Sequence, residues 1–261
     1  RLARIVCQRC GRPICPIDMR EASVGFQCPP CVTTGVKAQR QPKTVFGGTI
    51  SANPTSVTTT IIAINVIVFV AMMATGGTRG PIYQEGAMWS YGVMQGEYWR
   101  MLSSAFLHSG IMHIAFNMLA LYLFGPAIEE ALGRTQYLAT YLTLAVAGSV
   151  WVYWLSSPSA STVGASGVVF GLLGLILVFM INSKQDVTGL LVLLGINAVI
   201  SLQANISWQA HLGGFVTGAL LALVFVKAPR GKQRQYHLMA FGGLWLFIVA
   251  ATALRTAQLW G

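Results

Sequence analysis

Charged side chains are scarce in this 261-residue chain, and their scarcity excludes an ordinary soluble protein. Only 9% of the residues are Asp, Glu, Lys or Arg, whereas a typical soluble domain carries roughly 25%. Hydrophobic residues make up 54% of the chain, and the mean hydropathy is +0.62. Much of the surface must therefore face lipid. We predict an all-α protein that crosses the membrane several times, because helices satisfy their own backbone hydrogen bonds in a bilayer.

Acidic side chains are the scarcest of all, with seven against 17 Lys and Arg residues. They all lie in the N-terminal region or in predicted loops at the ends of membrane spans: Asp18, Glu21, Glu85, Glu97, Glu129, Glu130 and Asp186. This distribution excludes a carboxylate buried within the membrane as the partner of a catalytic histidine.

Cysteine is missing beyond residue 31, and all five cysteines lie near the N-terminus. The motifs "CQRC" and "CPPC" are separated by seventeen residues, a spacing typical of four-cysteine zinc sites. We predict a structural Zn²⁺ held by Cys7, Cys10, Cys28 and Cys31, with Cys15 left over. The reducing cytoplasm favours metal over disulfides, and a redox C-x-x-C pair is the alternative.

The N-terminal region is basic but poor in aromatic residues. Its cations are Arg1, Arg4, Arg9, Arg12, Arg20, Lys37, Arg40 and Lys43. Phe26 is the one aromatic residue before Phe46, which argues against nucleic acid as a partner because bases stack on aromatic rings. We expect the charge to act as a topology signal with affinity for anionic lipid headgroups, and the region's free surface to be open to a protein partner.

Long hydrophobic runs predict seven membrane spans, each of which needs roughly 20 mostly apolar residues. The spans are Val57–Thr75, Ile111–Ile128, Tyr137–Leu155, Gly164–Asn182, Thr188–Leu202, His211–Lys227 and Leu238–Arg255. The predicted domains are a Cys-rich module at 1–43, a Gly/Ser/Pro-rich linker at 44–56, a six-span core at 57–227, and a loop with the seventh span at 228–261.

Basic residues in short loops orient the chain in the membrane. The N-terminal region, Lys184 and the stretch "KAPRGKQRQ" all lie on one side of the predicted spans, whereas "SSPSAST" on the other side carries no charge. Since Lys and Arg prefer cytoplasmic loops, we predict a cytoplasmic N-terminus and an external C-terminus, in the plasma (inner) membrane of the cell.

Polar residues gather at the outer ends of spans two, four and six. These ends carry His108, His113 and Asn117, then Ser166, then His211. His211 is a natural base for a Ser166 nucleophile, and His113 and Asn117 share a helix face as two hydrogen-bond donors. Taken singly, each residue is as well explained by helix packing or by interhelical hydrogen bonds.

Glycine spacing predicts that spans four and six lie close together. Gly167 and Gly171 follow the G-x-x-x-G pattern, as do Gly214 and Gly218. This pattern lets helix backbones approach each other in membranes. Close approach would bring Ser166 within reach of a histidine on the partner span.

These motifs together resemble the rhomboid family of intramembrane serine proteases. The matching stretches are "WR" (Trp99, Arg100), "HSGIMHIAFN", "GPAIEEALG" (Glu129), "GASG" (Gly164, Ser166) and "AHLGGFVTG" (His211). The resemblance runs from about Thr58 to Lys227 and implies a six-helix rhomboid core with a seventh helix appended.

The resemblance also implies roles for the residues. Ser166 is expected as nucleophile and His211 as general base, with His113 and Asn117 in the oxyanion hole. His108, Trp99, Arg100 and Gly164 are expected to support the site, and Glu129 to anchor the fold. Many relatives carry Tyr where this chain has Phe170, whose ring can still pack on the histidine.

The expected activity is cleavage of single-span membrane proteins near the outer leaflet, in a water-accessible cavity. A substrate helix hides its carbonyl groups in hydrogen bonds, so it must unwind locally before hydrolysis. One alternative is a catalytically inactive rhomboid-like adaptor or chaperone that binds transmembrane helices. Another is a transporter, which would carry polar residues at mid-membrane in repeated halves.

Overall fold

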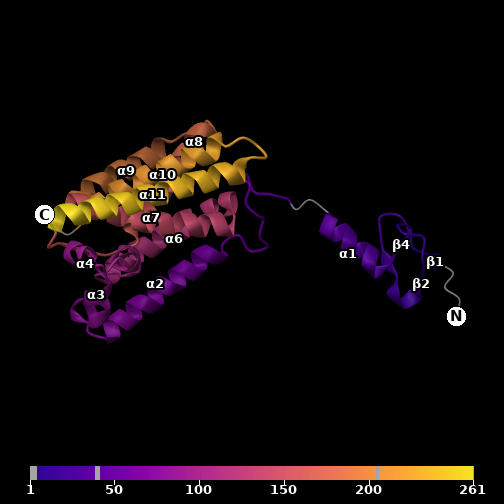
Figure 1. The fold of residues 1–261 in the computed structure, drawn as a ribbon, viewed down its shortest axis with the longest axis horizontal. Helices are drawn as coiled ribbons and strands as arrows, with labels where there is room; N and C mark the ends of the chain where they lie inside the picture. The colour runs from indigo at the N-terminus through magenta and orange to yellow at the C-terminus, as the bar shows by residue number, and fades with distance from the viewer. Residues whose placement is uncertain (1–4, 39–41, 204–205, 261) are drawn as a thin grey trace. The chain divides into compact units, whose positions relative to one another are not determined.

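The computed structural model describes residues 5–38, 42–203 and 206–260, and the chain divides into two units, Arg1–Pro42 and Lys43–Gly261 (Figure 1). Arg1, Arg4 and Arg40 of the predicted basic region lie outside the described residues.

The N-terminal unit is built from short hairpins and one helix. Its strands β1 and β2 pair antiparallel, as do β3 and β4. Gly11, with φ +69°, turns the chain between β1 and β2 in a conformation that favours glycine. The elements are β1 (Ile5–Val6), β2 (Pro13–Ile14), η1 (Pro16–Asp18), β3 (Arg20–Glu21), β4 (Phe26–Gln27) and α1 (Pro29–Ala38).

The second unit is a bundle of apolar helices joined by short connections. Its elements before the predicted serine are α2 (Ser56–Ala74), η2 (Gly77–Arg79), α3 (Pro81–Gly86), β5 (Met88–Trp89), α4 (Ser90–Met94), α5 (Arg100–Ser103), η3 (Ser104–Phe106), α6 (Ile111–Leu132), α7 (Arg134–Leu155) and β6 (Ser161–Thr162). The remaining helices are α8 (Ser166–Asn182), α9 (Thr188–Ser201), α10 (Trp208–Lys227) and α11 (Gln233–Trp260).

Seven of these helices coincide with the seven predicted spans. Within the described ranges, α2, α6, α7, α10 and α11 are long and apolar enough to cross a membrane. The other two, α8 with 17 residues and α9 with 14, are apolar but shorter. At a rise of about 1.5 Å per residue, neither spans the roughly 30 Å hydrocarbon layer alone. The prediction of seven apolar helices in an all-α fold is confirmed.

The helices α8 and α10 pack backbone to backbone through their glycines, as the spacing predicts. A Cβ atom on Gly214 would collide with the carbonyl oxygen of Gly167, and one on Gly218 would collide with that of Gly171. Since real Cβ atoms do not approach so closely, only glycine permits this contact. The two helices therefore meet along the half that carries Ser166 and His211.

The carboxylate of Glu129 joins the end of α6 to the start of α2. Its oxygens accept hydrogen bonds from the backbone N–H groups of Val57 and Thr58, at 2.9 and 2.8 Å, and from the Thr58 hydroxyl at 2.8 Å. A negative charge at the first turn of a helix satisfies donors that have no partner within the helix and interacts favourably with the helix dipole. Glu129 is buried, so this cap holds the two helices together inside the bundle.

The seventh helix, α11, lies along α7 and is attached by polar contacts over most of its length. Near one end, Gln136 Nε2 lies 3.1 Å from His237 Nδ1. Further along, Trp245 Nε1 donates to Thr143 Oγ1 at 3.1 Å, and Trp154 donates to the Ala251 carbonyl at 3.1 Å. This pattern makes α11 an integral part of the second unit.

The segment predicted as a linker is packed against the helices from Phe46 onward. The Phe46 ring stacks on the ring of Phe179 in α8, with centroids 4.4 Å apart. The backbone N–H of Phe46 donates to the Ala131 carbonyl at 3.3 Å. A Gly/Ser/Pro-rich composition predicts a loop, but it does not indicate where a single aromatic side chain will dock.

Candidate active site and cysteine cluster

The side chains of Ser166 and His211 form a hydrogen bond between α8 and α10. Ser166 is the first residue of α8, and His211 lies in the first turn of α10. The Ser166 Oγ to His211 Nε2 distance is 2.8 Å, within the range in which a histidine can take a proton from a nucleophile. His211 is buried, whereas Ser166 is partly exposed.

Two further side chains hold the imidazole of His211. The ring of Phe170 stacks on it nearly parallel, at 8°, with centroids 4.2 Å apart. On its other edge, Ser201 Oγ lies 2.6 Å from His211 Nδ1. Stacking fixes the plane of the ring, and the second hydrogen bond fixes its rotation within that plane. The position of Phe170 thus agrees with the packing expected for it.

The predicted oxyanion residues, His113 and Asn117, both lie on α6. His113 faces Gly164, where an added Cβ would lie 2.6 Å from His113 Nε2 and 3.7 Å from Ser166 Oγ. Gly164 has φ +126°, so both its backbone and the space around it require glycine. Asn117 donates one amide hydrogen to the His113 carbonyl at 2.8 Å, which leaves its second hydrogen for another acceptor.

The segment that leads into Ser166 is held by the loop between α2 and α6. Its strand β6 pairs with β5 of that loop, and the Gly164 N–H donates to the Ser104 carbonyl at 2.9 Å. Because α8 starts at Ser166, the backbone N–H groups of its first turn have no partner within the helix. They are therefore free to bind an anion at this position.

The predicted support residues order the same loop. Trp99 Nε1 donates to the Glu85 carbonyl at 3.0 Å. The buried Arg100 pairs with Glu97 at 2.5 Å and donates to the Gln84 and Ala87 carbonyls, at 2.7 and 3.1 Å.

His108 of this loop is fully buried, and its ring lies edge-on to that of His113, with centroids 5.1 Å apart. The loop thus packs directly against one of the predicted oxyanion residues.

An apolar hollow of 280 Å³ adjoins His211 between α8, α9 and α10. It is lined by Phe170, Leu194, Ala198, Ser201, Leu202, Trp208, His211, Leu212 and Phe215. The sequence predicts a hydrophilic cavity for hydrolysis, whereas the lining of this hollow is apolar.

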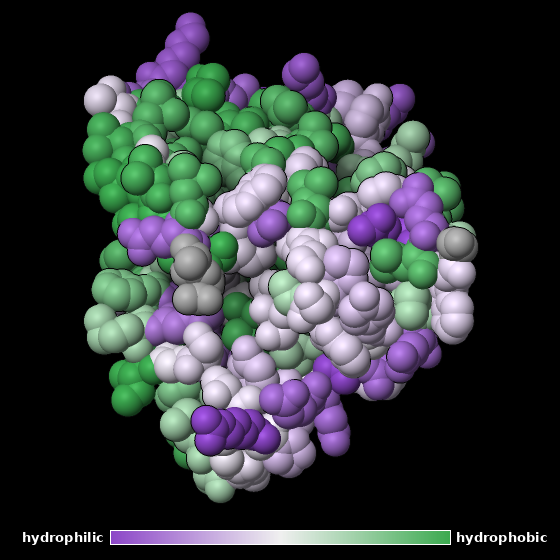
Figure 2. Space-filling model, turned by 90° about the vertical axis from the view of Figure 1, so that its left-hand side faces the viewer, coloured by the Kyte–Doolittle hydropathy of each residue, from purple (hydrophilic) through white to green (hydrophobic). Residues whose placement is uncertain are grey.

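Figure 2 shows the end of the bundle that carries α3 and α4. Hydrophilic residues and residues of intermediate hydropathy are mixed on this face, and hydrophobic residues gather toward one side of it.

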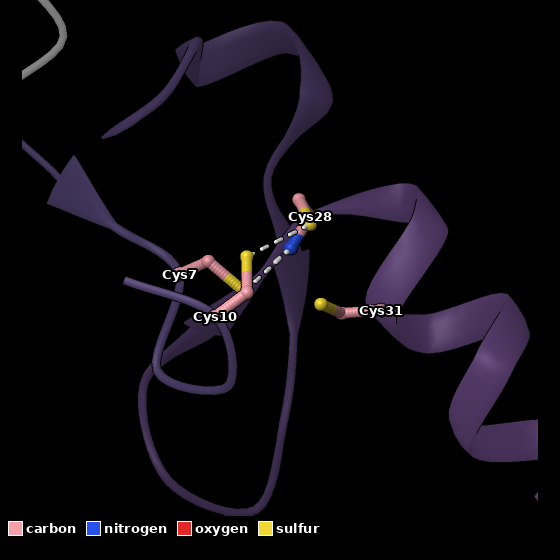
Figure 3. A group of neighbouring side chains, drawn as sticks. All are labelled: Cys7, Cys10, Cys28 and Cys31. Atoms are coloured by element: carbon pink, nitrogen blue, oxygen red, sulfur yellow. Dashed lines mark hydrogen bonds between the residues drawn. The ribbon is translucent and has the colours of Figure 1, made fainter. Parts of the chain in front are cut away.

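The four cysteines predicted as zinc ligands form one cluster in the N-terminal unit (Figure 3). Their sulfur atoms all lie within 4.8 Å of one another, and Cys10 Sγ lies 3.8 Å from Cys28 Sγ. A tetrahedral Zn²⁺ with bonds of about 2.3 Å places its sulfur ligands about 3.8 Å apart. The cluster therefore has the donor set and spacing of a metal site, and Cys15 is an exposed free cysteine outside it.

The backbone around the cluster explains the unusual prolines of "CPPC". The helix α1 begins at Pro29, so Cys28 precedes it and Cys31 lies in its first turn. Proline is favoured at the first helical position because its missing N–H would have no partner there. The two prolines therefore start the helix that carries the second ligand pair.

The thiols of Cys7 and Cys31 have pKa values shifted in opposite directions. The backbone N–H of Cys28 donates to the Cys7 sulfur at 3.4 Å and lowers the pKa of Cys7 to about 6. The neighbouring sulfurs of Cys28 and Cys10 raise the pKa of Cys31 to about 12. A bound divalent cation would favour the thiolate form of all four, as metal ligation requires.

Ser201 is the residue at this site that no sequence motif identifies. It is the last residue of α9, and it reaches His211 across the connection to α10. A serine at a helix end is common, and the only available signal is its position one helical turn after Asn197. That signal does not identify the histidine as its partner.

Comparisons with known proteins agree with the motifs. The family model for the rhomboid domain matches residues 95–228, slightly more than half of the chain. The candidate rhomboid protease YdcA of Bacillus subtilis is 34% identical over 155 residues, which cover 57% of this chain and 76% of the relative.

Two further relatives are matched over smaller parts of their own length. The rhomboid protease GluP of Bacillus subtilis is 33% identical over 210 residues, covering 76% of this chain and 41% of the relative. The rhomboid protease AarA of Providencia stuartii is 26% identical over 190 residues, covering 62% and 65% respectively. The matched domain contains every residue predicted for the active site, and the chain belongs to the rhomboid family.

Proposed function

We propose that this rhomboid is an intramembrane serine endopeptidase that cleaves transmembrane segments of other proteins with a Ser166–His211 dyad. The observation that carries the proposal is the 2.8 Å contact between Ser166 Oγ and His211 Nε2, made by two helices that begin at the same end of the bundle. The protease names of the relatives support the same reaction class.

The reaction begins with attack of Ser166 Oγ on a substrate carbonyl carbon. His211 Nε2 takes the hydroxyl proton as the new C–O bond forms, and the carbonyl oxygen becomes an oxyanion. We expect the N–H of Ser166 at the start of α8, the His113 ring beside Gly164 and the second amide hydrogen of Asn117 to donate hydrogen bonds to this oxygen. Donors fixed in advance around a developing charge are among the largest contributions to catalysis.

The second half of the reaction releases the two products. The protonated His211 gives its proton to the leaving amine as the C–N bond breaks, which leaves an ester on Ser166. A water molecule then attacks the ester carbonyl while His211 takes a proton from it. Release of the acid restores the serine hydroxyl and completes hydrolysis.

The substrate class follows from where the dyad lies. Both residues lie in helices of the apolar bundle, so the scissile carbonyl must come from a chain already in the membrane. A single-span helix with small or helix-breaking residues near its outer end unwinds most easily and exposes such a carbonyl. With the cytoplasmic N-terminus and external C-terminus inferred from the basic loops, the site faces outward across the plasma membrane.

Cleavage in reconstituted vesicles tests this proposal. We expect the purified protein to cut a single-span test substrate with a Gly-rich outer end, and mass spectrometry to place the cut in that outer segment. A matched substrate with leucines in place of the glycines is expected to be cut at least about tenfold more slowly, because its helix unwinds less readily. Binding of the substrate without any cleavage would instead support the adaptor alternative.

We propose in addition that the four-cysteine cluster holds one structural Zn²⁺. The sulfur spacing supports it, and the ion would stabilise the short hairpins and α1, which have few other buried side chains to hold them. We place the N-terminal unit in the cytoplasm, so its basic residues and any protein that binds it would lie on that side of the membrane.

Metal analysis of the full-length protein, purified under reducing conditions, tests the zinc proposal. We expect about one Zn²⁺ per chain, and its loss in Cys7→Ser and in Cys28→Ser, because each substitution removes one of four ligands. Cys15→Ser is the matched control and is expected to retain the metal. A wild-type protein without zinc, or a Cys15→Ser protein that loses it, would contradict the assignment.

A further inference from the structure

We infer that Ser201 is a positioning residue that holds His211 in the tautomer and orientation needed to act as the base; this inference rests on the proposed function. Among the described residues, no carboxylate is hydrogen-bonded to His211, and all seven acidic residues lie in the N-terminal unit, in loops or near helix ends. The Ser201 hydroxyl takes the position that an aspartate occupies in a Ser-His-Asp triad.

The direction of each hydrogen bond follows from the number of protons available. Ser201 Oγ lies 2.7 Å from the Asn197 carbonyl oxygen, one helical turn earlier in α9. A carbonyl can only accept, so the single hydroxyl proton of Ser201 points to Asn197. The Ser201 oxygen must then accept from His211, whose Nδ1 lies 2.6 Å away.

This direction fixes the protonation state of the imidazole. If Nδ1 of neutral His211 carries the hydrogen, Nε2 carries the lone pair. Nε2 is the atom that lies 2.8 Å from Ser166 Oγ, so the serine donates to it. The contacts thus form one continuous chain in which protons point from Ser166 to His211, from His211 to Ser201, and from Ser201 to the Asn197 carbonyl.

Burial strengthens the influence of these hydrogen bonds on the His211 tautomer. Ser201 is 4% exposed and His211 is 8% exposed, so water competes weakly for either contact. Without the Ser201 oxygen, the buried Nδ1–H would lack its acceptor, and the opposite tautomer would place a hydrogen on Nε2, where it could not accept the serine proton. Phe170 stacks on the ring face, which leaves both tautomers equally possible. Ser201 is the contact that distinguishes them.

The test compares substitutions that change the hydroxyl and the shape of this side chain separately. Ser201→Thr keeps a hydroxyl, which in a helix can bond to the preceding turn. Ser201→Val introduces a side chain of nearly the same shape as threonine but without a hydroxyl. Ser201→Ala removes the hydroxyl without adding bulk. The kcat and KM for a transmembrane substrate are measured for each purified protein, along with the thermal unfolding midpoint.

We expect Val and Ala to lower kcat by about 10- to 100-fold, the effect of one buried donor left without its acceptor, with KM nearly unchanged. Thr is expected to stay within about threefold of wild type in kcat. A structural role alone would affect Thr and Val alike through their common shape, and would lower the unfolding midpoint together with activity.

The results separate this inference from the proposed function. Folded Ala or Val proteins with the kcat of wild type would overturn the role of Ser201 while the dyad stands, and the Ala protein decides the matter if the bulkier variants fail to fold. Cleavage that persists in Ser166→Ala would instead overturn the proposed function, whatever the Ser201 variants do.

Discussion

Ser166→Ala and His211→Ala are each expected to lower kcat for substrate cleavage by about 10⁴-fold or more. Alanine at Ser166 removes the atom that forms the covalent intermediate. Alanine at His211 leaves the hydroxyl protonated, because the hydrogen bond that prepares its attack is the 2.8 Å contact to Nε2. The double variant is expected to be no slower than either single one, since the two residues act as a unit.

Steady-state cleavage of a transmembrane substrate, with the unfolding midpoint as a check of folding, measures this effect. Ser183→Ala is the matched control, because it changes an exposed serine just beyond the opposite end of α8 and is expected to leave kcat unchanged. A Ser166→Ala protein with more than about one hundredth of the wild-type kcat would contradict the assigned nucleophile.

Gly214→Ala is expected to have the second-largest effect, although it adds only one methyl group. The new Cβ would collide with the carbonyl oxygen of Gly167, the residue that directly follows Ser166. Relief of the collision must separate α10 from α8 and so move His211 away from the serine. A displacement of about 1 Å at reacting groups can cost roughly 100-fold in rate, so we expect a loss of at least this size.

The same substitution is expected to lower the unfolding midpoint, since close glycine contacts stabilise membrane helix pairs. Gly243→Ala in α11 is the matched control: a Cβ there meets no atom within 4 Å, so neither activity nor stability should fall. If Gly214→Ala kept full activity and stability, the backbone contact between α8 and α10 would not be what sets the dyad geometry.

The sequence predicted the parts of the structure that depend on strong local rules. Glycine spacing predicted the contact between α8 and α10 because no other residue permits such a close approach. The cysteine spacing predicted the cluster for a similar reason, since reduced proteins seldom bring four thiols together except at a metal site. Ser166 and His211 lie at the N-terminal ends of predicted spans four and six, and the direction of successive helices placed both at one end of the bundle.

Other features depend on tertiary contacts that local patterns do not encode. Ser201 is the last residue of α9, His211 lies ten residues later in α10, and no periodicity links them. Phe46 docks on α8 from a segment whose composition indicates only a loop. The late start of α8 at Ser166 depends on β5 and β6, two-residue strands that are too short for their pattern to be recognised.

The most direct test of the central claim is covalent labelling of the purified protein by a fluorophosphonate probe in detergent, because such a probe reacts preferentially with an activated serine. We expect labelling of wild type at Ser166, located by mass spectrometry, and loss of that labelling in Ser166→Ala and in His211→Ala. Failure of folded wild-type protein to label, or labelling that persists in folded His211→Ala, would contradict the dyad.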